Sequence, residues 1–163
     1  MKVIGYIAAV LTGVWQRTFG ETKYIANTYN APNAGTVGSG IRTFKADEAI
    51  TRNYVVKIGA GTPTTEYVQK GDSATEIPLG IALDEAEAQH DPISVFILGA
   101  ASGTVKVVAA AAINQGALVQ SNGDGTVKTC VSTGYPIGRA LQAAQAAGDI
   151  IEITPILAEH ALA

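Results

Sequence analysis

The sequence predicts an all-β fold: a small β-barrel built from two pseudo-repeats, each with one short helical turn, preceded by an extended N-terminal arm. Three observations support this prediction. Eighteen glycines and six prolines, with many valine, isoleucine and threonine residues, favour short strands and tight turns. One pattern of residues occurs twice, at 78–95 and at 136–153. The segment before the first copy follows no such pattern and is rich in aromatic residues.

The two copies align without a gap when the register is shifted by 58 positions. Small and apolar residues recur at equivalent places, and the identical pairs are Pro78/Pro136, Gly80/Gly138, Ala82/Ala140, Leu83/Leu141, Ala86/Ala144, Ala88/Ala146, Asp91/Asp149 and Ile93/Ile151. Upstream, residues 49–56 resemble residues 112–119 at a slightly different offset. Each repeat is therefore expected to be one unit: a pair of strands, a turn, then a strand, a short helical turn and a strand.

The expected strands of the first repeat cover residues 54–58, 64–69, 79–83 and 93–98. The last of them is almost continuously apolar, which is typical of a strand covered on both faces. Asp84 precedes Glu87 by three positions, which is the spacing of a capping box. A helical turn is therefore predicted between the last two strands.

Residues 104–107 form an expected strand ahead of the second repeat, whose own expected strands cover residues 117–120, 126–131, 135–141 and 150–154. Asn122 and Gly123 lie in a short turn between two of these strands, which is a strong hairpin signal. Residues 142–147 form the second predicted helical turn, and Gly148 follows it at the place where helices commonly end.

The domain organisation predicted from these patterns is an arm at 1–45, a barrel domain at 46–157 and a short tail at 158–163. Residues 15–44 carry five aromatic rings, which a mobile tail normally lacks: Trp15, Phe19, Tyr24, Tyr29 and Phe44. Burying one such ring removes about 150 to 250 Å² of surface from water. Each ring is therefore expected to pack, either on its own barrel or on a neighbouring molecule.

Composition excludes several classes of partner. The net charge of −3 and the pI near 5.3 provide no basic face for nucleic acid. The apolar run at 1–15 is too short to cross a membrane before Gln16 and Arg17 interrupt it. Charged residues make up only 15% of the chain, against roughly 25% in ordinary soluble domains. So few charges suggest that part of the surface meets protein rather than water.

No catalytic, metal-binding or cofactor-binding set is predicted. On a helix, Glu87, His90 and Asp91 would share one face with a spacing that metal sites use. The second repeat has Gly148 where the first has His90, so it could not form the same site. His90 and His160 accompany no recognisable nucleophile motif. We therefore expect neither an enzyme nor a bound cofactor.

The order and duplication of these motifs resemble the capsid decoration, or cement, proteins of tailed bacteriophages. The resemblance is carried by PLGIALDEA with DPISV in the first repeat, and by PIGRALQAA with GDIIEI in the second. It covers about residues 44–156. The resemblance implies a barrel of the β-tulip kind that binds the outside of an assembled head, commonly as a trimer, without cofactor or catalysis. The long aromatic arm departs from the usual pattern of the family.

We therefore expect a homotrimeric structural protein on the outer capsid surface, bound to the major capsid protein of a tailed phage. The arm is expected to add a strand to a sheet edge of the capsid. The expected interface residues are Trp15, Arg17, Phe19, Tyr24, Tyr29 and Phe44. Two alternatives are a small ligand-binding or enzymatic barrel, with a pocket between the repeats near Asp84 and His90, and another virion component from the tail or neck.

Overall fold

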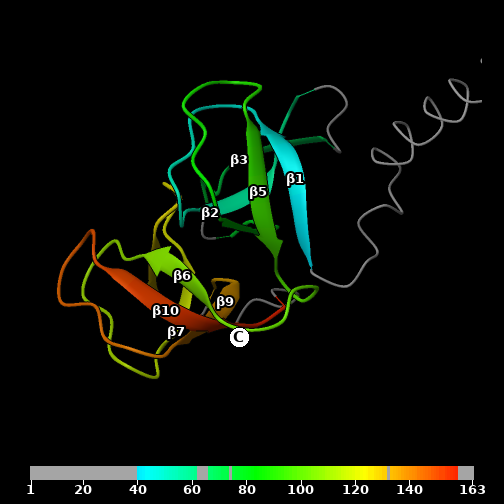
Figure 1. Ribbon diagram of the computed structural model, residues 1–163. Coiled ribbons are helices and arrows are strands. Elements are labelled where there is room, and N and C mark those ends of the chain that lie inside the picture. Colours follow the sequence, from blue (N-terminus) through cyan, green and yellow to red (C-terminus); the bar gives the residue numbers. More distant parts are fainter. Residues whose placement is uncertain (1–39, 62–65, 74, 132, 158–163) are drawn as a thin grey trace, which may run out of the picture. The chain divides into compact units, whose positions relative to one another are not determined.

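The computed structural model describes residues 40–61, 66–73, 75–131 and 133–157 (Figure 1). All of them belong to one compact domain that spans residues 38–163. The described residues form ten β-strands, and no α-helix occurs among them. The all-β prediction is therefore confirmed.

The first five strands form a closed barrel in the order β1-β3-β2-β4-β5. They are β1 (Ile41–Ala46), β2 (Val55–Ile58), β3 (Tyr67–Lys70), β4 (Gly80–Ala82) and β5 (Pro92–Ile97). All neighbouring strands are antiparallel except β1 and β3, whose parallel pairing through Ala46 and Val68 closes the barrel. Strand β1 makes its longest pairing with β5 (Figure 1). It occupies the end of the segment expected to be the arm.

The second five strands form another sheet in the order β6-β10-β9-β7-β8. They are β6 (Val105–Val108), β7 (Leu118–Ser121), β8 (Val127–Thr129), β9 (Pro136–Ala140) and β10 (Ile150–Pro155). A single parallel bridge between Ala109 and Val127 joins the two edge strands. This bridge is the counterpart of the Ala46–Val68 pair, so the second sheet has the strand order of the barrel and the same point of closure.

Each repeat thus forms its own five-stranded unit, whereas the sequence was expected to form one barrel from both. The reason is that each of the ten strands pairs only with strands of its own half of the domain. Nine apolar residues fill the core of the first unit: Phe44, Ala46, Ile50, Val56, Val68, Ala82, Ala86, Ile93 and Val95. The equivalent positions of the second repeat are all apolar and buried too: Val107, Ala109, Ile113, Val119, Val127, Ala140, Ala144, Ile151 and Ile153.

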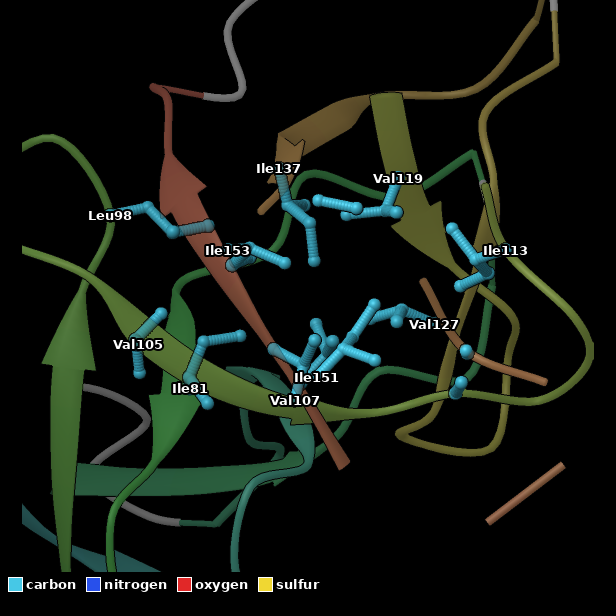
Figure 2. Close-up of a cluster of buried hydrophobic side chains, with 14 of the residues drawn as sticks. Ile81, Leu98, Val105, Val107, Ile113, Val119, Val127, Ile137, Ile151 and Ile153 are labelled. Carbon is cyan, nitrogen blue, oxygen red and sulfur yellow. The ribbon is translucent and has the colours of Figure 1, made fainter. Parts of the chain in front are cut away.

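Side chains that point out of the first barrel connect it to the second unit. Because successive strand residues face opposite ways, Val55 lies outside the barrel core that Val56 fills. Ile81, Phe96 and Leu98 face the same way as Val55, and all four belong to the cluster that contains the second core. Figure 2 shows Ile81 and Leu98 among the side chains of the second repeat. Burying a side chain of this size contributes about 1.5 to 3 kcal/mol.

The prediction of a helical turn in each repeat, after Asp84 and at residues 142–147, is wrong. Ala86 forms an antiparallel bridge with Ile50, and Ala144 forms the equivalent bridge with Ile113. In both pairs the backbone N–H of each residue donates to the carbonyl of the other. A helical turn uses its backbone N–H and carbonyl groups for hydrogen bonds along the chain, whereas here those of Ala86 and Ala144 are bound to a distant segment.

In place of each helical turn there is a loop, and an aspartate at its end binds two backbone N–H groups of the same loop. The Asp91 Oδ2 atom accepts hydrogen bonds from the backbone N–H groups of Glu87 and Ala88, at 3.1 and 2.9 Å. The Asp149 Oδ2 atom accepts the two equivalent bonds, at 2.7 and 3.0 Å. The spacing between Asp84 and Glu87 therefore does not mark a capping box, because the carboxylate that binds these N–H groups comes from the end of the loop.

Candidate functional site

The interface residues expected from the sequence fall into two groups. Trp15, Arg17, Phe19, Tyr24 and Tyr29 lie outside the described residues. Phe44 is described, is 6% exposed and belongs to the barrel core. The Arg42 guanidinium lies 5.1 Å from the centre of its ring. Phe44 therefore packs within its own domain and not on an open surface, because on β1 its side chain faces inward together with that of Ala46.

His90 is held by a neighbouring tyrosine. The Tyr67 hydroxyl lies 3.1 Å from His90 Nδ1, and the two rings meet edge to face at 5.6 Å. The His90 backbone has a φ of 75°, and its N–H donates to the Ala46 carbonyl. Because residues 84–90 form no helix, Glu87 and His90 do not share a helix face. Within the described residues, no group of three or more His, Cys, Asp or Glu side chains could hold a metal ion.

Lys57 ties β2 to the loop between β3 and β4. Its Nζ atom lies 2.6 Å from Asp72 Oδ1 and 2.6 Å from Glu76 Oε2, and its side chain is only 14% exposed. Desolvation lowers the pKa of Lys57, but the two hydrogen-bonded carboxylates outweigh it and raise the pKa above its usual value. The hydrogen bond from Lys57 lowers the pKa of Asp72. The contact is an ion pair that holds a loop.

A polar pocket of about 550 Å³ lies between the repeats, lined by Asp47, Glu48, Gln69, Lys70, Asp72, Gly123 and Asp124. Neither Asp84 nor His90, which were expected beside such a pocket, lines it. Partial burial raises the pKa of Asp124, but hydrogen bonds from the Thr126 hydroxyl and backbone N–H outweigh it and lower the pKa. Asp47 accepts from the Ala60 N–H and from Gln89, and Glu48 accepts from the Lys70 N–H. These carboxylates are engaged within the chain.

Gly40, the residue before β1, lies against the turn between β5 and β6. The Gly40 carbonyl accepts a hydrogen bond from the Ile97 N–H at 2.9 Å. Gly40 has a φ of +63°, and a Cβ atom there would lie 2.1 Å from the Ala101 backbone nitrogen. On the same turn, a Cβ atom at Gly99 would lie 2.6 Å from the Leu157 side chain. The segments that contain Gly40 and Leu157 therefore meet at one turn.

Two large apolar side chains are exposed near this turn. Ile41 is 44% exposed and Leu157 is 54% exposed. Sequence reasoning did not single out either residue, because isolated apolar residues at strand ends carry no pattern. The two segments are brought together by the turn, where Gly40 approaches Ala101 and Gly99 approaches the Leu157 side chain. Over the described ranges, no helix has both the length and the apolar character needed to cross a membrane.

Comparisons with known proteins agree on one structural class. No curated protein sequence matches the chain. Among solved structures, the chain is similar to the N base of the head fiber gp8.5 in bacteriophage phi29, with a TM-score of 0.56 and 18% sequence identity. The likeness covers 74% of this chain and 98% of that one, and it concerns the fold. Residues 36–155 match the family described as phage cement protein. Because this match spans most of the chain, the chain belongs to the phage cement protein family, a family of structural proteins of the virion head surface.

Proposed function

We propose that this protein binds the outer surface of an assembled tailed-phage capsid, through the major capsid protein, and stabilises the shell. The observation that carries the proposal is the match of residues 36–155 to the phage cement protein family. The low proportion of charged residues, 15%, supports a surface that meets other protein.

The proposed stabilisation needs no chemistry. A protein that binds the assembled shell and not its free subunits shifts the assembly equilibrium by mass action. At a free concentration 100 times the dissociation constant, one such site stabilises the bound state by about 2.7 kcal/mol. Many weak sites on one shell would together resist its disassembly.

The arm is the proposed attachment segment, followed by the barrel domain and a tail at 158–163. Its anchors are Trp15, Arg17, Phe19, Tyr24 and Tyr29, because aromatic and arginine side chains dominate the energetics of protein interfaces. In this proposal the arm adds a strand to a sheet edge of the capsid, so that backbone bonds supply affinity and the rings supply specificity. Phe44 is not one of the proposed anchors, because its side chain lies in the barrel core.

We further propose that the protein acts as a homotrimer. Three arms held together would bind with an avidity far above that of one arm, because the second and third contacts become intramolecular. Mass measurement of the purified protein by light scattering tests this part separately. A mass near three times 16.7 kDa supports it, and a ring of six or twelve copies points instead to a tail or neck component.

Co-sedimentation with undecorated phage heads tests the proposed binding. The full chain, a variant that lacks residues 1–39, and the double variant Trp15→Ala/Phe19→Ala are compared with Tyr6→Ala as the matched control in the arm. The truncation stops before β1 because Ile41–Ala46 belongs to the barrel. Unassembled capsid subunits are the control for shell specificity.

Saturable binding of the full chain to heads, absent with free subunits, is the expected result. Loss of binding on truncation and in the double variant, with Tyr6→Ala unchanged, supports attachment by the arm. Undiminished binding of the truncated chain would transfer the contact to the barrel domain. Absence of binding by the full chain would refute the proposed function itself.

A further inference from the structure

One end of the described domain has a distinct chemical character. Segments 40–41, 97–105 and 155–157 meet there, and none of these three contains a charged residue. Ile41 and Leu157 expose 44% and 54% of their surface at this end. We call the surface formed by Ile41, the turn at 98–101 and Leu157 the terminal face.

The opposite end of the same strands is acidic. The loop after β1 carries Asp47 and Glu48, and the loop before β5 carries exposed Asp84, Glu85 and Glu87. The Gln89 side chain donates to Asp47, which shows that the two loops lie together. Charged residues are depleted from the centres of protein interfaces, and an acidic end is readily solvated. The two ends of the barrel therefore suit different surroundings.

We propose that the terminal face is the surface of the domain that lies against the capsid shell, with the acidic end directed away from it. This inference rests on the proposed function. The partner is an assembled shell of capsid subunits that offers an uncharged, apolar contact.

The connectivity of the chain favours the capsid shell as the partner of the terminal face. The sequence continues from the terminal face in both directions, because residue 39 precedes Gly40 and residue 158 follows Leu157. About 11 residues separate Tyr29 from Gly40, and a fully extended segment of that length spans at most ~40 Å. An arm bound to the shell therefore holds the terminal face close to the shell at a high effective concentration. The exposed Ile41 and Leu157 side chains are then the nearest apolar groups of the domain.

The chain offers a matched pair of variants for the test. Leu157 follows β10 and is 54% exposed, whereas Ile150 begins the same strand and is 55% exposed. Roughly 20 Å of strand separates them, at about 3.3 Å per residue. In full-length protein, Leu157→Lys places a charge on the terminal face, and Ile150→Lys places the same charge at the other end of the strand.

Binding to undecorated heads is measured for both variants and for the unaltered protein. We expect Leu157→Lys to weaken binding about tenfold or more, and Ile150→Lys to change it less than about twofold. Equal binding of both variants, or a loss confined to Ile150→Lys, would overturn the inference while leaving the proposed function intact. If the unaltered protein does not bind heads, the proposed function has failed, and the inference fails with it.

A labelling experiment covers the case in which a lysine variant fails to fold. On a Cys130→Ser background, Leu157→Cys and Ile150→Cys each provide one thiol for a maleimide reagent. Without heads, both thiols are expected to react at similar rates. With saturating heads, we expect the thiol at 157 to be protected and the thiol at 150 to react as before. Protection at 150 alone, or at neither position, would contradict the proposed orientation.

Discussion

Ile81 and Arg139 occupy equivalent positions in the two repeats, yet Ile81 is fully buried and Arg139 is exposed. Ile81 pairs with Val55 and Phe96, and this apolar trio packs against the second unit. Arg139 pairs with the equivalents of these two residues, Leu118 and Thr154. The first repeat thus packs through a face that the second repeat leaves to solvent.

The variant Ile81→Arg is expected to lose at least about 3 kcal/mol of unfolding free energy, because it buries a charge without a partner between the units. Arg139→Ile is expected to change stability by less than about 1 kcal/mol, but to increase self-association through an enlarged apolar surface. Urea unfolding and sedimentation velocity measure the two effects. Arg139→Lys is the control, and similar stability losses at both positions would contradict the assigned packing.

Asp149→Ala is expected to lower the free energy of unfolding by about 1 to 2 kcal/mol, because the N–H groups of Gln145 and Ala146 lose their acceptor. Asp91→Ala is expected to cost a similar amount through the equivalent bonds in the first repeat. Urea unfolding measures both. Asp149→Asn keeps an oxygen acceptor, so a loss as large as that of Asp149→Ala would show that the charge matters more than the hydrogen bonds.

Lys57→Met is expected to cost about 1 kcal/mol at most, because Asp72 and Glu76 are 57% and 45% exposed and water screens the pair. Folding raises the pKa of Lys57, so its contribution is complete below about pH 10.4, the usual lysine value, and is lost as the pH rises through the folded pKa. Folding lowers the pKa of Asp72, so its contribution is present above about pH 3.9 and is lost as the pH falls through the folded pKa.

The difference in unfolding free energy between Lys57→Met and the unaltered protein is therefore expected to stay constant between about pH 5 and pH 9. It should shrink as the pH falls below about 4. Lys45→Met is the control, since the Lys45–Glu66 pair is about half exposed on both sides and should contribute less. Urea unfolding over this pH range checks the expectation. A difference that peaks near pH 4 would refute it.

Gly40→Ala is expected to destabilise the protein by about 2 kcal/mol or more, because its φ of +63° disfavours a side chain and its Cβ would collide with the Ala101 backbone. Gly116→Ala is the matched control. Gly116 has a φ of +81° but no atom within 4 Å of an added Cβ, so only the backbone cost of about 1 kcal/mol applies. Thermal unfolding compares the two, and equal losses would show that the approach of Gly40 to the turn is not tight.

Periodicity and duplication were sufficient to predict β2 to β10 and much of the core, but not β1, which lies in the segment expected to be the arm. Strand side chains alternate between two faces, so an apolar pattern that recurs at a fixed offset predicts equivalent inward positions, such as Ile93 and Ile151. The helical turns were predicted wrongly because the spacing of Asp84 and Glu87 is local. The hydrogen bonds that replace a helix come from Ile50 and Asp91, and the sequence spacing gave no sign of either.

The sequence by itself determined the all-β class, the two repeats and the resemblance to phage cement proteins, because these depend on residue type and order. Only the tertiary structure decided that each repeat forms its own unit, that Phe44 is buried in one of them and that Gly40 and Leu157 meet at one turn. Those facts depend on contacts between residues far apart in the chain. No local pattern encodes such contacts, because they form only when strands from different segments pair and pack.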